Sequence, residues 1–413
     1  MVSWLEDYID EKVENIMKRL SSAFSLRLLF AAGVIFQLAW YGLLWSRMLT
    51  QPNVSRPTDY SIFYTAGRIA ASGHYSQLYD LQTQRQVRET LLGHPIQIDQ
   101  VLLFNHPPLL VPILQLISTQ DYMTSYWRWV LVMLCFVAAT MVVIYQLLRA
   151  MQWDTGSRWI FIISALLFYP IFVSLLKGQD TAFLLFGALL WLYGVIMKRD
   201  IPAGIGLALT LIRPQIALIL AVPFFFNRRK TCWWFCAGAA VLGLYSILLV
   251  GSGGVRDFLN LLRISASGEG FGMGQNAMFN FTGMALRLFP YANLNAIHLI
   301  AWGLFMVVII GLSIWWKISP EIDYRHIVLL STLSVFAAPH LHYHDLALLI
   351  IPVLGLALAV VKKGHLRVWK AALSPMLVSV LFLIADWWNP LLYTMPYLIM
   401  GALPILAWYY ETH

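Results

Sequence analysis

Asp59 stands in a polar segment directly after the first long apolar run, next to Tyr60 and close to Tyr64. A carboxylate beside aromatic rings can act as a general base that takes a proton from an acceptor hydroxyl. The same residue type also caps helices, and residues 60–72 have a helical composition. The sequence alone leaves the base and the cap open as alternatives.

Two further polar sites interrupt apolar runs. Arg213 precedes Pro214 in the middle of one run, where a charge is costly and usually functional. Arg binds phosphate in bidentate fashion, although its long side chain can also reach an interface. In the turn of residues 177–180, Lys177 can face a phosphate and Gln179 a sugar hydroxyl. A plain polar hairpin loop is the alternative reading of this turn.

Three histidines alternate in the segment His340-Leu341-His342-Tyr343-His344. In an extended chain they would share one face, as zinc ligands do. A metal site needs a complete and fixed ligand set, however, and this segment links two apolar runs. The pattern therefore favours histidines that handle a phosphate or a proton over a metal site, with interfacial packing as the remaining alternative.

A weaker polar group is formed by Gln275, Asn276 and Arg287, which could line one wall of a substrate site. The three cysteines all fall in apolar stretches, which predicts packing roles and no disulfide. No nucleotide-binding glycine motif and no HExxH motif occurs in the sequence. An enzyme that lacks a soluble nucleotide-binding domain has to take an activated donor from the membrane itself.

The elements that must position these residues follow from composition. Of the 413 residues 60% are hydrophobic and 12% are charged, whereas soluble domains carry about 25% charged residues. The apolar runs are long and continuous, which predicts membrane helices and excludes a barrel. The net charge of +8 comes from short basic clusters between these runs, so it indicates topology and not nucleic-acid binding.

We predict an all-α polytopic membrane protein with about twelve transmembrane helices. The run 203–226 counts as two short helices, because Pro214 breaks it. Residues 107–118 are too short to cross and are predicted to form an interfacial or re-entrant helix. The expected helices lie at roughly 27–46, 126–148, 159–176, 180–197, 203–226, 231–250, 297–316, 325–338, 343–361, 370–386 and 391–410.

The basic clusters place both termini in the cytoplasm and the polar clusters on the outside of the cell (inner or plasma) membrane. Residues 1–24 predict an amphipathic helix on the cytoplasmic leaflet, and residues 25–413 a single integral-membrane catalytic domain. The outer segments are roughly 47–125, with short helices near 60–72 and 80–92, and 251–296. The second is rich in glycine, which favours a mobile lid.

The motifs then resemble glycosyltransferase family 87. The resemblance spans residues 55–345. It rests on Asp59-Tyr60 with Phe63-Tyr64, Leu78-Tyr79-Asp80, Asn105-His106-Pro107-Pro108, Gly178-Gln179, Arg213-Pro214 and Pro339-His340, in that order.

The resemblance implies a GT-C-type fold and an inverting transfer of one sugar, mannose on this likeness, from a polyprenyl-phosphate donor to a lipid or glycan acceptor. It implies Asp59 as the catalytic base, with Arg213, Lys177, His340 and His342 near the donor phosphate. The remaining candidates are expected to bind substrate: Tyr60, Tyr64, His106, Gln179, Gln275, Asn276, Arg287 and His344.

No cofactor and no metal is required by the sequence, because fixed cations can stabilise the departing phosphate. The expected partners are the donor, the acceptor and membrane lipids, with no nucleic acid. Two other classes remain open: a transporter or flippase of lipid-linked sugars, whose broken helices would look similar, and an undecaprenyl-linked glycan ligase or polymerase.

Overall fold

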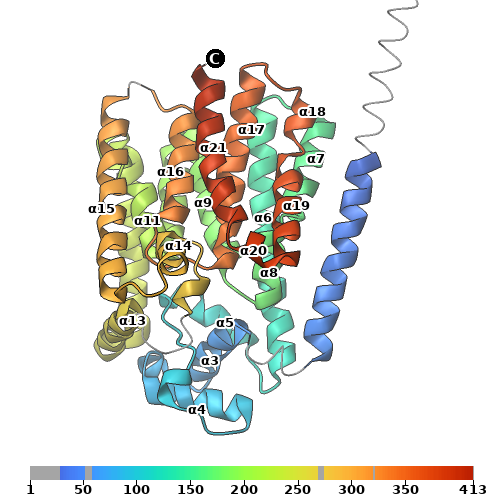
Figure 1. Cartoon of the computed structure of the whole chain (residues 1–413). Helices are drawn as coiled ribbons and strands as arrows, with labels where there is room; N and C mark the ends of the chain where they lie inside the picture. Colours follow the sequence, from blue (N-terminus) through green and yellow to red (C-terminus); the bar gives the residue numbers. More distant parts are fainter. Residues whose placement is uncertain (1–27, 52–57, 268–273, 320, 413) are drawn as a thin grey trace, which may run out of the picture. The chain divides into compact units, whose positions relative to one another are not determined.

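A computed structural model describes residues 28–51, 58–267, 274–319 and 321–412 (Figure 1). Most of the described residues are helical, and no strand occurs among them. The chain forms two compact units, Met1–Gln51 and Pro52–His413. The described part of the first unit is one apolar helix, Leu28–Thr50. The predicted amphipathic helix at 1–24 lies outside the described residues.

Six helices in the described part of the chain are long and apolar enough to cross a membrane, or seven if the bent pair α7 (Thr155–Leu166) and α8 (Tyr169–Lys177) forms one span. The other predicted runs also form helices, but they are shorter. The count of twelve crossings therefore stays a prediction. The six are Leu28–Thr50, α6 (Tyr122–Ala150), α13 (Arg229–Ser267), α15 (Leu294–Ile318), η6 with α17 (Tyr343–Lys362) and α18 with α19 (Val368–Trp387).

The segment predicted to lie outside, residues 47–125, contains the short helices predicted there, α3 (Tyr60–Ala71) and α4 (Leu81–Leu92). Asp80 caps α4 by accepting from the backbone N–H of Thr83 at 2.8 Å. The apolar stretch Pro108–Ile117 ends in α5 (Val111–Ile117) and reaches only roughly 15 Å, too little to cross a membrane. It packs against α3, which agrees with the predicted interfacial helix.

The middle of the chain forms a tight hairpin. Helix α9 (Thr181–Ile196) packs against α10 (Asp200–Leu209) through glycines whose missing Cβ atoms let the backbones touch. A Cβ at Gly194 would lie 2.3 Å from the backbone nitrogen of Ala203, and one at Gly206 would lie 2.3 Å from that of Trp191. The chain continues through η4 (Thr210–Ile212) to α11 (Pro214–Ala221) and α12 (Phe224–Asn227). The predicted break at Pro214 is confirmed.

The predicted loop from residue 251 onwards is wrong for its first part. Helix α13 continues to Ser267 across a kink at Gly251, where φ is 71° and ψ is 175°. Apolar residues return at helical spacing after the kink, and Leu261 is buried. Gly251 therefore ends the first of two helices, as predicted, and a second helix follows it where a loop was expected. The proposed lid would include residues 268–273, which lie outside the described residues.

The C-terminal third closes the bundle. Helix α16 (Tyr324–Phe336) packs against both α17 (Ile350–Lys362) and α21 (Met395–Thr412), and the three run side by side in Figure 1. Between α15 and the preceding helices lie η5 (Gln275–Ala277) and α14 (Phe281–Leu288). The histidine segment joins α16 to η6 (Tyr343–Leu349).

Gly178 ends α8 in the left-handed conformation, with φ of 69°, and a Cβ there would lie 2.5 Å from the Cβ of Tyr60. We expect Gly178→Ala to destabilise the protein by about 2–5 kcal/mol, through backbone strain and overpacking together. Thermal unfolding in detergent measures this.

The matched control is Gly73→Ala, which has the same handedness (φ 81°) but no atom within 4 Å of the new Cβ. It should cost only about 1 kcal/mol. Equal losses for both variants would contradict the close contact with Tyr60.

Candidate active site

The site is built around a buried ion pair between Arg213, at the end of η4, and Asp180, at the start of α9. Arg213 donates from Nη2 to Oδ1 of Asp180 at 2.8 Å and from Nη1 to Oδ2 at 3.3 Å. Nδ1 of His106 lies 2.9 Å from Oδ2 of Asp180 and 2.6 Å from Nη1 of Arg213. All three side chains are largely shielded, with 1% of Asp180 and 10% of Arg213 exposed. Burial, then the charge of Arg213, lowers the pKa of His106, so its ring is neutral.

A second carboxylate extends this cluster towards the histidines. Oδ1 of Asp345 lies 3.8 Å from Nε of Arg213 and accepts from the hydroxyl of Thr181 at 3.4 Å. Nε2 of His344 lies 3.6 Å from Oδ2 of Asp345, and its Nδ1 lies 3.9 Å from Oδ2 of Asp59. A continuous chain of ionisable groups thus runs from Asp180 to Asp59.

Asp59 is the accessible member of this chain, with 37% of its side chain exposed. It occupies the N-cap position of α3, but its side chain makes no capping hydrogen bond. Asp180 and Asp345 are buried, with 1% and 3% of their side chains exposed, and both already lie against Arg213. Of the three carboxylates, Asp59 is therefore the one that a hydroxyl from outside can approach.

The turn that presents Asp180 is held by its neighbours. Gly178 allows the chain to leave α8 in the left-handed conformation, and its carbonyl accepts from Nε1 of Trp129 at 2.9 Å. The ring of Trp129 stacks on Phe63 of α3, and Phe63 meets His106 edge to face at 5.0 Å. These contacts fix α3, and with it Asp59, relative to the ion pair.

Two of the three histidines, His340 and His342, precede η6, and His344 lies in its first turn. The rings of His340 and His342 lie 4.7 Å apart, and those of His342 and His344 lie 5.9 Å apart. Gln215 donates to the backbone carbonyl of His340 at 3.2 Å, which ties this segment to α11. Burial, then the neighbouring imidazoles, lowers the pKa of His340 to about 3 and that of His342 to about 4. Both rings are neutral near pH 7 and can donate hydrogen bonds.

Several predicted substrate residues have structural contacts. Tyr60 is fully buried against the rings of Tyr122 and Tyr126. The hydroxyl of Tyr64 donates to the carbonyls of Thr119 and Gln120. Neither tyrosine contacts the ionic cluster. Their substrate contacts stay predictions, and these positions do not favour them.

The two polar side chains predicted to act in the turn of residues 177–180 lie in different surroundings. Lys177 is exposed and makes no ion pair with any residue that the structure describes. Gln179 is buried, and its Oε1 has no hydrogen-bond partner among the described residues. An unpaired buried amide oxygen is costly, which makes Gln179 a candidate acceptor for a sugar hydroxyl.

Gln275, Asn276 and Arg287 contact residues outside the ionic cluster. Arg287 donates to the carbonyls of Asn276 and Met278 and to the hydroxyl of Tyr397, and its guanidinium lies over the ring of Tyr393 at 4.7 Å. Gln275 pairs with His298 at 2.9 Å. No direct contact joins these side chains to Arg213 within the described residues.

The same segment meets the histidines through its backbone. The N–H of Phe279 donates to the carbonyl of Leu341 at 3.0 Å, and Asn280 donates to the carbonyl of Ala338 at 2.7 Å. Phe279 and Asn280 thus hold the histidine segment in place, and substrate binding by Gln275, Asn276 and Arg287 stays a prediction.

Asp180 and Asp345 are site residues that the sequence did not predict. Each adjoins a predicted motif: Asp180 ends the 177–180 turn, and Asp345 directly follows His344. An acidic residue at the edge of an apolar helix was the available signal. In the described part of the chain no group of three or more His, Cys, Asp or Glu side chains is placed to hold a metal ion.

The apolar helices and the buried ionic cluster define a multi-pass membrane protein with a polar site at one end of its helices. The sequence matches glycosyltransferase family 87 over residues 104–352, more than half of the chain, and the protein belongs to this family. It is accordingly a membrane glycosyltransferase with a sugar donor and an acceptor. The match includes His106, Arg213 and the histidine segment but begins after Asp59. No curated protein matches the chain.

The ion pair makes a testable prediction about stability. Asp180→Asn or Arg213→Met alone leaves one buried charge poorly compensated, and each should cost about 3–5 kcal/mol. The double variant removes both charges and should cost clearly less than the sum. Thermal unfolding of the four proteins in detergent measures the coupling, and additive losses would contradict a direct pair.

The histidines predict how stability depends on pH. The folded pKa values of about 3 and 4 lie below the ordinary value of 6.5, so the folded state binds fewer protons than the unfolded state between these limits. Stability should therefore fall as the pH is lowered from about 6.5 to about 4. Melting temperatures across this range test it.

In His340→Gln/His342→Gln this decline should become shallower. The control is His94→Gln, an exposed histidine directly after α4, which should keep the wild-type slope. An unchanged slope in the double variant would rule out these two histidines as its source.

Proposed function

We propose that this protein is an inverting glycosyltransferase that moves one sugar from a polyprenyl-phosphate donor to a hydroxyl of a lipid or glycan acceptor on the extracytoplasmic face of the cell membrane. The observation that carries the proposal is the position of Asp59. It is an accessible carboxylate without a capping bond, 3.9 Å from His344 and at the end of the buried ionic chain.

In the proposed reaction Asp59 takes the proton of the acceptor hydroxyl as its oxygen attacks the anomeric carbon. The bond between that carbon and the phosphate oxygen breaks, and the polyprenyl phosphate leaves with the electron pair. Attack from the face opposite the leaving group inverts the anomeric centre. The sugar is mannose on the family resemblance stated above.

The departing phosphate needs hydrogen-bond donors where its charge develops. His342 supplies a neutral N–H group within the electrostatic influence of Asp59, and the ring of His340 lies 4.7 Å from that of His342. Lys177 is exposed and free to turn towards a lipid phosphate. Together these residues make up the donor-phosphate site in this proposal.

Arg213 receives a revised role. All of its guanidinium nitrogens face Asp180, His106 or Asp345, and a phosphate would have to displace one of them. We therefore assign Arg213 to positioning: it holds Asp345, and through Asp345 the imidazole of His344 beside Asp59. His106 contributes to the same anchor.

Asp59→Asn tests the proposal directly. The assay uses purified protein, polyprenyl-phosphate-[14C]mannose and an extract of lipid acceptors. We expect the transfer rate to fall by about 10²–10⁴-fold, the usual contribution of a general base. The melting temperature should stay unchanged, because this side chain caps no helix.

Asp99→Asn is the matched control, since Asp99 is an exposed carboxylate of the same outer segment. It should transfer sugar at the wild-type rate. Equal transfer by Asp59→Asn would exclude Asp59 as the base. Normal lipid flipping by both proteins with no transfer by wild type would favour the transporter reading.

A further inference from the structure

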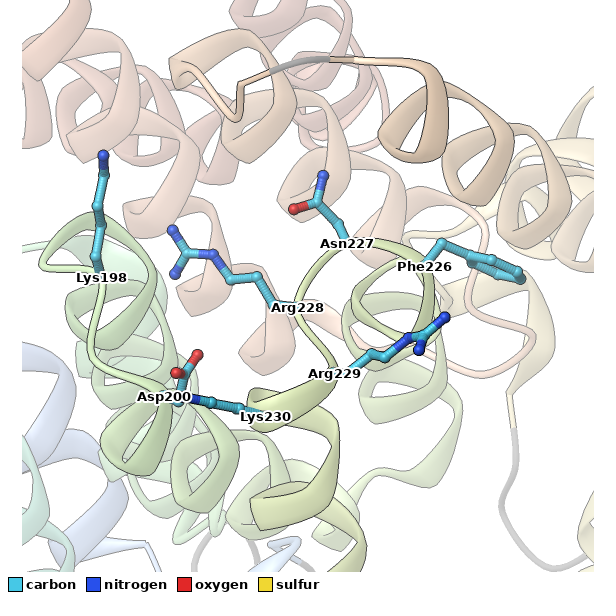
Figure 2. Close-up of a pocket in the computed structure, with 7 residues that line it drawn as sticks. All are labelled: Lys198, Asp200, Phe226, Asn227, Arg228, Arg229 and Lys230. Carbon is cyan, nitrogen blue, oxygen red and sulfur yellow. The ribbon is translucent and has the colours of Figure 1, made fainter.

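An open pocket of about 520 Å³ lies far from the ionic cluster, where the α9–α10 loop meets the α12–α13 loop (Figure 2). Helix α9 begins directly after Asp180 and its 16 residues extend roughly 24 Å before this loop. The pocket is thus at the opposite end of the helices from Arg213. The proposed transfer reaction makes no use of it.

The pocket carries an excess of positive charge. Its lining includes the cations Lys198, Arg228, Arg229 and Lys230, against the carboxylate of Asp200. That carboxylate already accepts a hydrogen bond from Thr231 at 2.8 Å. Basic loops can also serve only to set the orientation of a membrane protein, but a loop with that role alone does not have to form a pocket.

Arg228 distinguishes this pocket from a plain basic loop. Its Nη1 is buried and has no hydrogen-bond partner within the part of the chain that the structure describes. Figure 2 shows its side chain extending towards Lys198 and Asp200, whereas Arg229 extends to the other side. A buried donor without an acceptor is costly, and an anion in the pocket would supply that acceptor.

Two helices also begin at the pocket: α10 at Asp200 and α13 at Arg229. The first N–H groups of a helix lack partners inside the helix and carry partial positive charge. Phosphate groups bind readily at such ends. The backbone thus favours the same kind of ligand as the side chains.

The surroundings indicate that the phosphate belongs to a lipid. Phe226 lines the pocket and is 53% exposed, and Trp233 on the first turns of α13 is 75% exposed. Exposed aromatic residues of this kind mark the membrane interface. We propose that the pocket binds the phosphate headgroup of an anionic phospholipid, with the acyl chains along Phe226 and α13.

The test uses the full-length protein, stripped of lipid in neutral detergent and titrated with phosphatidylglycerol. Native mass spectrometry counts bound lipid, and the melting temperature reports stabilisation. Phosphatidylcholine is the reference lipid. In Arg228→Gln/Lys230→Gln we expect phosphatidylglycerol affinity to fall about 30-fold, from the loss of two interfacial cations.

The control is Arg367→Gln/Lys370→Gln, which removes the same charge from exposed residues in the loop before and within α18. It should bind as wild type does. If the double pocket variant does not fold, Lys198→Gln replaces it, with a smaller expected loss.

Equal binding by the pocket variant and the control would overturn the proposal, and so would equal affinity for phosphatidylcholine. Inorganic phosphate is the last arm of the experiment. One outcome is that inorganic phosphate alone raises the melting temperature as much as phosphatidylglycerol does and also prevents phosphatidylglycerol from binding. In that outcome the pocket takes free phosphate and the lipid assignment fails. Selective loss in the pocket variant would support the site.

Discussion

The ion pair between Arg213 and Asp180 is the constraint on which the candidate site depends. Two charges can lie among apolar helices only if each compensates the other, because desolvation costs several kcal/mol per ion. The pair therefore requires the end of η4 and the start of α9 to meet. The glycine contacts between α9 and α10 make that meeting possible, since they let the two backbones touch.

This arrangement separates the carboxylates by role. Asp180 and Asp345 are buried and balance Arg213, whereas Asp59 reaches the surface beside His344. A base has to be accessible and ionised, and a structural counter-ion has to be shielded and fixed. The three residues have the same side chain, so their surroundings alone distinguish them. The proposed division into one base and two anchors follows from these differences in exposure.

Much of the fold could be predicted. The length and continuity of the apolar runs identified the membrane helices, and Pro214 identified the break before α11. The loop expected at residues 251–296 was wrong up to residue 267, because a second helix with renewed apolar spacing follows the break at Gly251. The site was predicted in part: the Arg213, His106 and histidine motifs do meet, but Tyr60 and Tyr64 pack against other residues.

The sequence by itself determined that this is an α-helical membrane protein, since apolar length and charge placement are properties of the linear chain. It also supplied the ordered motifs of the family. Only the tertiary structure decided which charges compensate one another. Pairing depends on distances between residues such as Arg213 and Asp180, 33 positions apart, and burial depends on what packs over them. Neither distance nor burial is encoded locally.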